Sequence, residues 1–293
     1  MRIATRSSAL ALTQSGLVAD TLGGAEMVEI ETDPTPGDKE RFVRGVERAV
    51  LDGRADIGVH SAKDLPGQMT SGLTIAAVPE REDPRDAWIG PGDSIDSIPE
   101  GARVGTVSLR RRAQLLALRP DLRPVELRGN VDTRLRKLEA GEADGIVLAM
   151  AGLNRLGRGD EASFVIPLET MTPAAGQGCL VVQTRSGADG EFREINDFPA
   201  EAELLAERAA VVALGADCSS PVGIHARHAD GRLVIDGFAG LADGSVWVRD
   251  QLEGDPGHPE PIGRELARRM ILAGASDILR RSASLGSGAE QVG

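Results

Sequence analysis

The chain has two cysteines, and their surroundings differ. Cys218 lies in the stretch Gly-Ala-Asp-Cys-Ser-Ser-Pro-Val-Gly, between an apolar helical pattern and a strand pattern. Loops on rigid scaffolds often carry function, although this position alone favours an incidental exposed thiol. Cys179 precedes the apolar run Leu180–Thr184, so we expect a buried, inert thiol there. Two cysteines form no disulfide framework, which is typical of a reducing compartment.

A charged pair directly follows a predicted strand. The strand is expected at Asp56–Val59, and His60-Ser61-Ala62-Lys63-Asp64-Leu65-Pro66 comes after it. Ligands of α/β sheets bind at the carboxyl ends of strands. Lys63 offers a positive point charge there, and Asp64 offers a carboxylate. The alternative is a turn that carries a solvated ion pair, and the residues alone leave both interpretations open.

Arginines and hydroxyl groups gather where predicted strands pass into helices. Residues 105–112 read GTVSLRRR, residues 128–134 read RGNVDTR, and Arg6 with Ser8 forms a third such junction. Hydroxyls and backbone N–H groups at a helix start bind anions, whereas arginines in the first turn oppose the helix dipole. A bound carboxylate would compensate them; the alternative is a solvated basic helix face. Three such junctions predict a ligand with several carboxylates, held between two lobes.

The first two thirds of the chain alternate strand and helix patterns, which predicts α/β architecture with parallel or mixed sheets. Strands are expected at 2–5, 27–32, 56–59, 73–78, 103–107, 124–127, 145–149, 164–167 and 180–184. Helices are expected from a Ser8 cap to Leu22, at 42–51, from a Ser108 cap to Leu118, and at 131–139. The charged stretch Pro79–Pro84 predicts a linker, and Pro173–Gly178 predicts a flexible return connection that lets 180–184 complete the first sheet.

The character of the chain changes near Ala200. A helix is expected at 202–214, a loop at 215–221, antiparallel strands at 222–226, 233–238 and 246–249, a helix at 262–279, and a disordered tail from Ser284. We therefore predict three domains: a first α/β lobe at 1–80 with 178–198, a second at 81–177, and an α+β domain at 199–293 that carries Cys218.

Composition excludes several classes of protein. The net charge is −12, the pI is about 4.9 and aromatic residues make up 2%, so nucleic acid is not an expected partner. No apolar run approaches the roughly 20 residues of a membrane helix, so no membrane association is expected. The N-terminus lacks the pattern of a secretory signal, which predicts the cytoplasm. The four histidines do not stand at metal spacing with a cysteine, so no metal site is expected.

Eight stretches of the chain, from Arg2 to about Gly223, form an ordered series. They are IATRSSALAL, ADIGVHSAKDLP, EREDPRDAW, GTVSLRRRAQL, LRGNVDTRL, LAMAGLNRLG, AAGQG and DCSSPVG. Together they resemble the successive blocks of the porphobilinogen deaminase (hydroxymethylbilane synthase) family, and eight ordered blocks are more specific than one motif. The resemblance implies two periplasmic-binding-protein-like (type II) α/β lobes with mixed sheets, plus a small α+β C-terminal domain, which matches only loosely.

The resemblance also implies roles for individual residues. Cys218 matches the cysteine that holds a dipyrromethane cofactor through a thioether, which changes its interpretation. Asp64 matches the family's catalytic aspartate, which hydrogen-bonds pyrrole N–H groups. Positions that bind the acetate and propionate groups of cofactor and substrate are matched by Arg6, Ser8, Lys63, Thr106, Ser108, Arg110, Arg111, Arg128, Arg134 and Arg155. Ser61 is grouped with them because it stands in the block of Asp64, and Gln177 lies in the hinge-side block that closes over the site.

The implied reaction joins four porphobilinogen molecules head to tail, with loss of ammonia, to give hydroxymethylbilane for haem biosynthesis. Asp64 would stabilise positive charge on the pyrrole nitrogens, and the arginines would align the reacting carbons. The dipyrromethane would stay on Cys218 when the product leaves. The expected partner is the small-molecule substrate, and the expected state is a monomer.

The chain departs from the family pattern at three places. Thr32–Phe42, which contains Lys39, is shorter than the family's usual active-site loop; Val107 replaces a common serine; and Ala216-Asp217 replaces a glycine pair. The alternative function is a non-catalytic two-lobed binder of a small polycarboxylate, because fold does not fix function. Such a binder would need neither Cys218 nor the third domain. A nucleic-acid protein built on the arginines 110–112 is excluded by the net charge.

Overall fold

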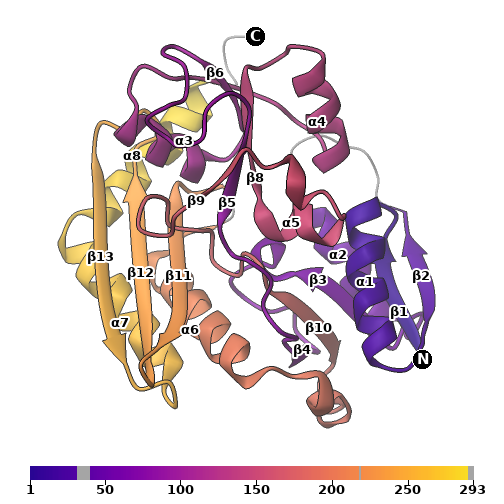
Figure 1. Ribbon diagram of the computed structural model, residues 1–293. Coiled ribbons are helices and arrows are strands. Elements are labelled where there is room, and N and C mark those ends of the chain that lie inside the picture. Colours follow the sequence, from indigo (N-terminus) through magenta and orange to yellow (C-terminus); the bar gives the residue numbers. More distant parts are fainter. Residues whose placement is uncertain (32–39, 218, 290–293) are drawn as a thin grey trace.

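A computed structural model describes residues 1–31, 40–217 and 219–289 (Figure 1). Its first sheet has the strand order β2-β1-β3-β10-β4. The strands are β1 (Arg2–Arg6), β2 (Glu26–Ile30), β3 (Ile57–Ser61), β4 (Leu73–Ala77) and β10 (Leu180–Arg185). β1 pairs in parallel with β2 and β3, whereas β10 is antiparallel to both β3 and β4. The prediction that residues 180–184 complete the first sheet is confirmed.

The second sheet repeats this plan, with the order β7-β6-β8-β5-β9. Its strands are β5 (Asp86–Ile89), β6 (Arg103–Gly105), β7 (Arg123–Val125), β8 (Gly145–Ala149) and β9 (Phe164–Ile166). β6 is parallel to β7 and β8, whereas β5 is antiparallel to β8 and β9. In each sheet, the antiparallel strand is the one that the chain supplies after crossing from the other sheet. This shared order defines two type II periplasmic-binding-protein-like lobes, as expected.

Helices cover the two lobes. They are α1 (Ala9–Thr21), α2 (Glu40–Leu51), α3 (Leu109–Leu118), α4 (Val131–Glu139) and the short α5 (Met150–Arg155). The predicted caps are confirmed, since the side chain of Ser8 accepts from the N–H of Ala11 and that of Ser108 from the N–H of Arg111. The sequence patterns missed α5 and β5, because both are too short to show a period.

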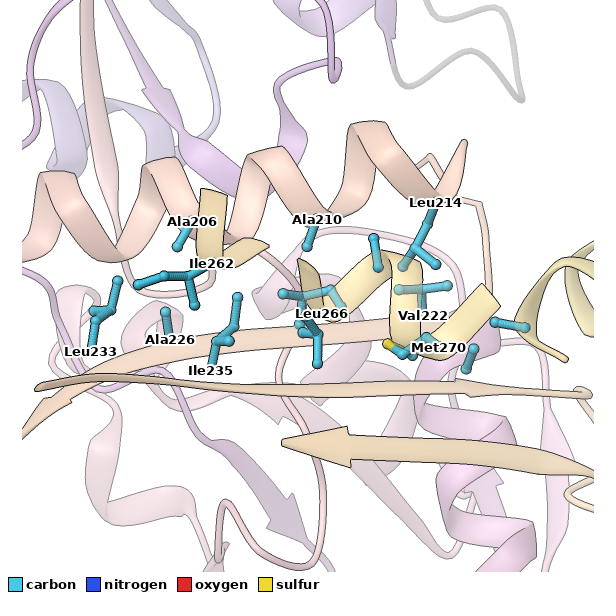
Figure 2. Packing of buried hydrophobic residues seen from close by; sticks show 14 residues of the cluster. Ala206, Ala210, Leu214, Val222, Ala226, Leu233, Ile235, Ile262, Leu266 and Met270 are labelled. Atoms are coloured by element: carbon cyan, nitrogen blue, oxygen red, sulfur yellow. The ribbon is translucent and has the colours of Figure 1, made fainter. Parts of the chain in front are cut away.

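The third part of the molecule packs two helices against an antiparallel sheet. The sheet has the order β11-β12-β13, from β11 (Val222–Ala229), β12 (Arg232–Gly240) and β13 (Trp247–Gly254). Figure 2 shows its core between the strands, α6 (Phe198–Leu214) and α7 (Pro259–Leu272), with Leu266 and Met270 among the buried side chains. A Cβ atom built on Gly263 would lie 2.0 Å from the carbonyl oxygen of Ala206, so glycine is required where α6 and α7 meet.

Two predictions for the C-terminal region are wrong. The single helix at 262–279 is two helices, α7 and α8 (Ala275–Ala289), because the chain turns at Gly274, whose φ is 105°. The tail from Ser284 continues α8 to Ala289, since adding turns to an existing helix costs less than starting one. Residues 290–293 lie outside the described residues. In the described parts of the chain, no helix has the length and apolar character needed to cross a membrane.

Candidate functional site

A cavity of about 310 Å³ lies where the two lobes and the third part of the molecule meet. Its walls come from the residues after β3, the first turn of α3, α4, the connection before β10, and α6 with the loop after it. Seven predicted site residues line it: Lys63, Asp64, Ser108, Arg110, Arg111, Arg134 and Gln177. The structure therefore brings the charged pair that follows β3 in the first lobe together with charged residues of two predicted junctions in the second lobe.

Asp64 lies at the junction of two hollows. The short 3₁₀ helix Ala62–Asp64 directly follows β3, which places its carboxylate at the carboxyl end of the strand. Asp64 lines the main cavity and also a smaller recess, whose other lining residues include Arg6 and Ser61. The hydroxyl of Ser61 accepts a hydrogen bond of 2.9 Å from Nε2 of Gln14 on α1, which ties this loop to the first helix.

Asp86 is the functional-site residue that sequence reasoning missed. It is fully buried at the start of β5, where it accepts from Arg110 Nη1 at 2.7 Å and from Arg111 Nη2 at 2.8 Å. Burial alone would raise the pKa of Asp86, but the two guanidinium groups outweigh burial and hold the pKa below its ordinary value. The protein itself thus supplies a compensating carboxylate, Asp86, and the predicted contact of these arginines with a bound carboxylate stays a prediction. The sequence signal that could have identified Asp86 is a charged residue at the start of the otherwise apolar strand Asp86–Ile89.

Gln177 connects Asp86 to Lys63. Its amide nitrogen donates to the Pro84 carbonyl at 2.7 Å and to Asp86 Oδ1 at 3.0 Å. Its amide oxygen accepts from Lys63 Nζ at 3.4 Å. The predicted flexibility of Pro173–Gly178 is wrong at this residue, because Gln177 is buried and held at both ends of its side chain. Burial, and then the positive charge of Arg111, lower the pKa of Lys63 to about 8.

Arg134, on α4, lines the cavity with one of its side-chain donors unsatisfied by the described residues. Its Nε atom is buried and has no hydrogen-bond partner among the described residues. Burial, and then repulsion from Arg111, lower its pKa to about 10. A buried donor without a partner is costly, so this atom marks a place where an acidic ligand would be stabilised.

Four described site residues of the prediction line neither the main cavity nor the smaller recess. Ser8 caps α1, and the hydroxyl of Thr106 accepts from the N–H of Ser108 at 3.1 Å. Nη2 of Arg155 donates to the carbonyl of Gly178 at 2.7 Å. Arg128 is exposed and pairs with Glu126 at 3.0 Å. Their predicted contacts with ligand stay predictions.

Cys218 lies outside the described residues, as do residues 32–39 with Lys39. The residues on either side of Cys218 are described, and both Asp217 and Ser220 line the cavity. The carboxylate of Asp217 accepts from the N–H of Ser219 at 2.8 Å and from the hydroxyl of Ser220 at 3.0 Å. The side chain that replaces a family glycine therefore closes a local turn. The loop begins after Gly215, whose φ of 63° ends α6.

Cys179 is buried, as expected, with 1% of its surface exposed. Burial raises the pKa of its thiol to about 12. A thiol that stays protonated is a poor nucleophile, so Cys179 is unsuited to hold a ligand covalently. Among the described residues, no group of three or more His, Cys, Asp or Glu side chains is arranged to hold a metal ion.

Glu207 is a second residue that sequence reasoning missed. It is fully buried on α6, where Oε1 accepts from Arg81 Nη1 at 2.8 Å and from the N–H of Ala226 at 2.7 Å, and Oε2 accepts from the N–H of Gly176 at 2.6 Å. Arg81 and Gly176 belong to the two connections between the lobes. The position of Glu207 three residues after Leu204, on an apolar face of the helix, was the available signal.

Comparisons with known proteins identify the family of this chain. The sequence family described as "Porphobilinogen deaminase, dipyromethane cofactor binding domain" matches residues 1–193, and "Porphobilinogen deaminase, C-terminal domain" matches residues 202–272. A porphobilinogen deaminase of Rubrobacter xylanophilus is 44% identical over 94% of this chain and 95% of its own. One of Campylobacter curvus is 42% identical over 96% of this chain and 97% of its own.

Similar solved structures are more distant. A TRAP periplasmic solute binding protein from Desulfovibrio salexigens is 14% identical, with a TM-score of 0.40, over 69% of this chain and 72% of its own. The family assignment therefore rests on sequence, since the two family domains match residues 1–193 and 202–272 and the relative from Campylobacter curvus is similar over almost the whole of both chains. This chain belongs to the porphobilinogen deaminase family.

Proposed function

We propose that this protein is a transferase that joins four porphobilinogen molecules head to tail, with loss of ammonia, and releases hydroxymethylbilane. The growing chain is built on a dipyrromethane cofactor held by Cys218. One observation carries the proposal: a single cavity holds Asp64, several cationic side chains and the residues on both sides of Cys218. The family match supports the same cofactor and substrate.

The residues present fit a dipyrromethane that bears acidic arms. Among the described residues, the buried Nε of Arg134 lacks a hydrogen-bond partner, and the side chain of Lys63 forms a single hydrogen bond, of 3.4 Å, with Gln177. Arg110 and Arg111 each donate three hydrogen bonds within the protein, which leaves donors on both guanidinium groups. When bound, the cofactor supplies the pyrrole carbon that is extended. Asp64 and the cations form the polar side of its site.

Asp64 performs the central step in this proposal. Its carboxylate accepts from pyrrole N–H groups and stabilises the positive charge that develops on the pyrrole nitrogen as ammonia leaves. A fixed carboxylate in a partly enclosed site needs no reorganisation at that moment, which increases the stabilisation. Lys63 and Arg134 bind acidic arms and thereby hold the reacting carbons in line. Asp86 holds the guanidinium groups of Arg110 and Arg111 in place, so both groups stay at one wall of the cavity.

Intact mass of the purified protein tests the proposal. We expect a covalent addition of several hundred daltons and formation of hydroxymethylbilane from porphobilinogen. Cys218→Ser should remove the added mass and the activity, whereas the matched variant Cys179→Ser should keep both, because Cys179 is buried. A bare chain mass without product formation would favour the non-catalytic binder of polycarboxylates. Added mass that survives Cys218→Ser would show that another residue holds the cofactor.

We also infer that the enzyme acts as a monomer in the cytoplasm. Both lobes and the third part of the chain contribute residues to the cavity, so a single chain carries all the described groups that the proposal uses. Light scattering during size-exclusion chromatography tests the oligomeric state at the concentration used for assay. A dimer mass for the active fraction would contradict this inference.

A further inference from the structure

Arg208, on α6, is a cavity residue that neither the sequence motifs nor the mechanism above uses. It lines the main cavity and also an adjoining groove between α6, α7 and the first lobe. Unlike Arg110 and Arg111, which bind Asp86, Arg208 forms no ion pair with any described carboxylate. The cation therefore contributes an unneutralised charge to the cavity wall.

One nitrogen of the Arg208 side chain is anchored to the loop that follows Asp64. Nη2 donates to the carbonyl of Pro66 at 2.9 Å and to the carbonyl of Gly67 at 3.0 Å. These contacts hold the planar guanidinium group at a fixed place, which reduces the entropy lost when it binds a ligand. Burial lowers the pKa of Arg208, yet arginine remains charged in proteins.

The other nitrogens are available. Among the described residues, Nε and Nη1 of Arg208 have no hydrogen-bond partner, and neither is a buried atom without a partner. Both can therefore donate into open space. Val211 and Ala216, which precede Cys218 in the chain, line the cavity together with Arg208. Nε shares its edge of the guanidinium plane with Nη2 and not with Nη1, so a carboxylate at the wall that α6 contributes would accept from either Nε or Nη1.

We propose that Arg208 is a further substrate-binding residue, which takes a carboxylate arm of porphobilinogen at the α6 wall of the cavity. The inference rests on the proposed function and adds to it a contact from the third part of the molecule. A charge-assisted hydrogen bond from Nε or Nη1 to a carboxylate oxygen would give this contact its strength. The same guanidinium group keeps the Asp64 loop beside the bound arm.

Steady-state kinetics of Arg208→Gln tests the inference. We expect the KM for porphobilinogen to rise about tenfold or more with kcat within about twofold, because one charge-assisted contact is lost. The matched control is Arg264→Gln, which removes an arginine from the adjoining groove but not from the cavity. Its KM should equal that of the unmodified protein. Arg208→Lys keeps the charge but loses the guanidinium group that the Pro66 and Gly67 carbonyls hold in place, so its KM should lie between those of the unmodified protein and Arg208→Gln.

The outcomes are distinguishable. Equal KM values for Arg208→Gln and Arg264→Gln would overturn the inference, and so would a fall in kcat with an unchanged KM, which would indicate that Arg208 only supports the loop. If Arg208→Gln does not fold, an unchanged KM in Arg208→Lys would overturn it. Absence of product from the unmodified protein would overturn the proposed function, and this inference with it.

Discussion

Three cationic side chains of the cavity differ in what neutralises them. Arg111 binds the buried carboxylate of Asp86. Among the described residues, Lys63 donates only to the amide oxygen of Gln177, and Arg134 has a buried nitrogen without a partner. Buried charges are stable only when they are paired, so Asp86 stabilises Arg111 within the protein, whereas Lys63 and Arg134 have no such carboxylate among the described residues. The pairing of each residue, rather than its type, therefore distinguishes the cations that the described protein neutralises from those that it does not.

Replacing Asp64 by asparagine tests its assigned role. We expect Asp64→Asn to lower turnover by about 10²-fold or more, because a neutral amide stabilises developing positive charge poorly. The intact mass should keep the cofactor, since Cys218 is unchanged. Asp52→Asn, which alters an exposed carboxylate outside the cavity, should leave turnover unchanged. Turnover in Asp64→Asn within a few-fold of the unmodified protein would refute the role of Asp64.

The lowered pKa of Lys63 predicts a pH dependence of substrate binding. The pKa of Lys63 is about 8 in the free enzyme, so its amine carries a positive charge below pH 8 and loses that charge as the pH rises through 8. An acidic substrate binds the charged form, so the KM for porphobilinogen should be constant below pH 7 and rise above pH 8. Each further pH unit raises it by up to about tenfold.

Lys63→Arg serves as the control for this pH profile, since arginine stays charged over the whole range. Its KM should show no rise near pH 8. Lys137→Arg changes a lysine outside the cavity and should keep the profile of the unmodified protein. A rise that persists unaltered in Lys63→Arg would assign the titration to another group.

At the scale of elements, α6 connects the scaffold to the site. The helix begins after the cap Asp197 and ends at Gly215, so the loop that contains Cys218 starts at a defined point. Glu207 faces the connections between the lobes, and its neighbour Arg208 faces the cavity. The position of this helix is set by α7, which packs against it at Gly263.

Gly263→Ala should destabilise the protein. The added Cβ would lie 2.0 Å from the Ala206 carbonyl oxygen and 3.0 Å from the Ala210 nitrogen, so the two helices must move apart. Overpacking of this kind costs about 1–3 kcal/mol. The control is Gly16→Ala in α1, where a Cβ meets nothing within 4 Å and alanine should stabilise the helix by about 0.5–1 kcal/mol. Urea unfolding measures the free energy of unfolding of both variants. Equal values for Gly263→Ala and Gly16→Ala would contradict the packing argument.

At the scale of the whole molecule, the two lobes and the third part meet at one carboxylate. Glu207 accepts from Arg81 in the first connection, from Gly176 in the second and from Ala226 in β11. Burial raises its pKa, but Arg81 outweighs burial and keeps the pKa below its ordinary value. Any change in the angle between the lobes must act on these contacts.

Glu207→Gln should loosen both connections. The substitution leaves Arg81 with Glu203 at 3.2 Å as its carboxylate partner, so the loss should not exceed the roughly 3–5 kcal/mol of a broken buried ion pair. Hydrogen exchange should quicken in residues 78–85 and 173–179 together, because one side chain anchors both. The matched control is Glu203→Gln, which removes a longer contact of 3.2 Å with the same arginine and should have a smaller effect. Faster exchange in one connection alone would show that the two are held independently.

The sequence predicted much of the fold from local patterns. The caps Ser8 and Ser108, helix 131–139 and strand 145–149 depend on neighbouring residues, so local rules suffice for them. Strand β5 was not predicted because it is four residues long and begins with a carboxylate, a group that is rarely buried without partners. Its partners, Arg110 and Arg111, come more than 20 residues later. The domain boundaries at 80, 177 and 198 stay predictions.

The sequence by itself determined the family, the candidate cysteine and aspartate, and the alternation of helices and strands, because motif order and periodicity are properties of the chain. Only the tertiary structure decided which charges neutralise one another. Asp86 binds two arginines for which the sequence predicts ligand contacts. Arg128 is exposed and does not line the cavity, whereas Arg208 lines the cavity from a helix that shows no binding motif. Electrostatic pairing depends on distance and burial, and folding sets both between residues far apart in sequence.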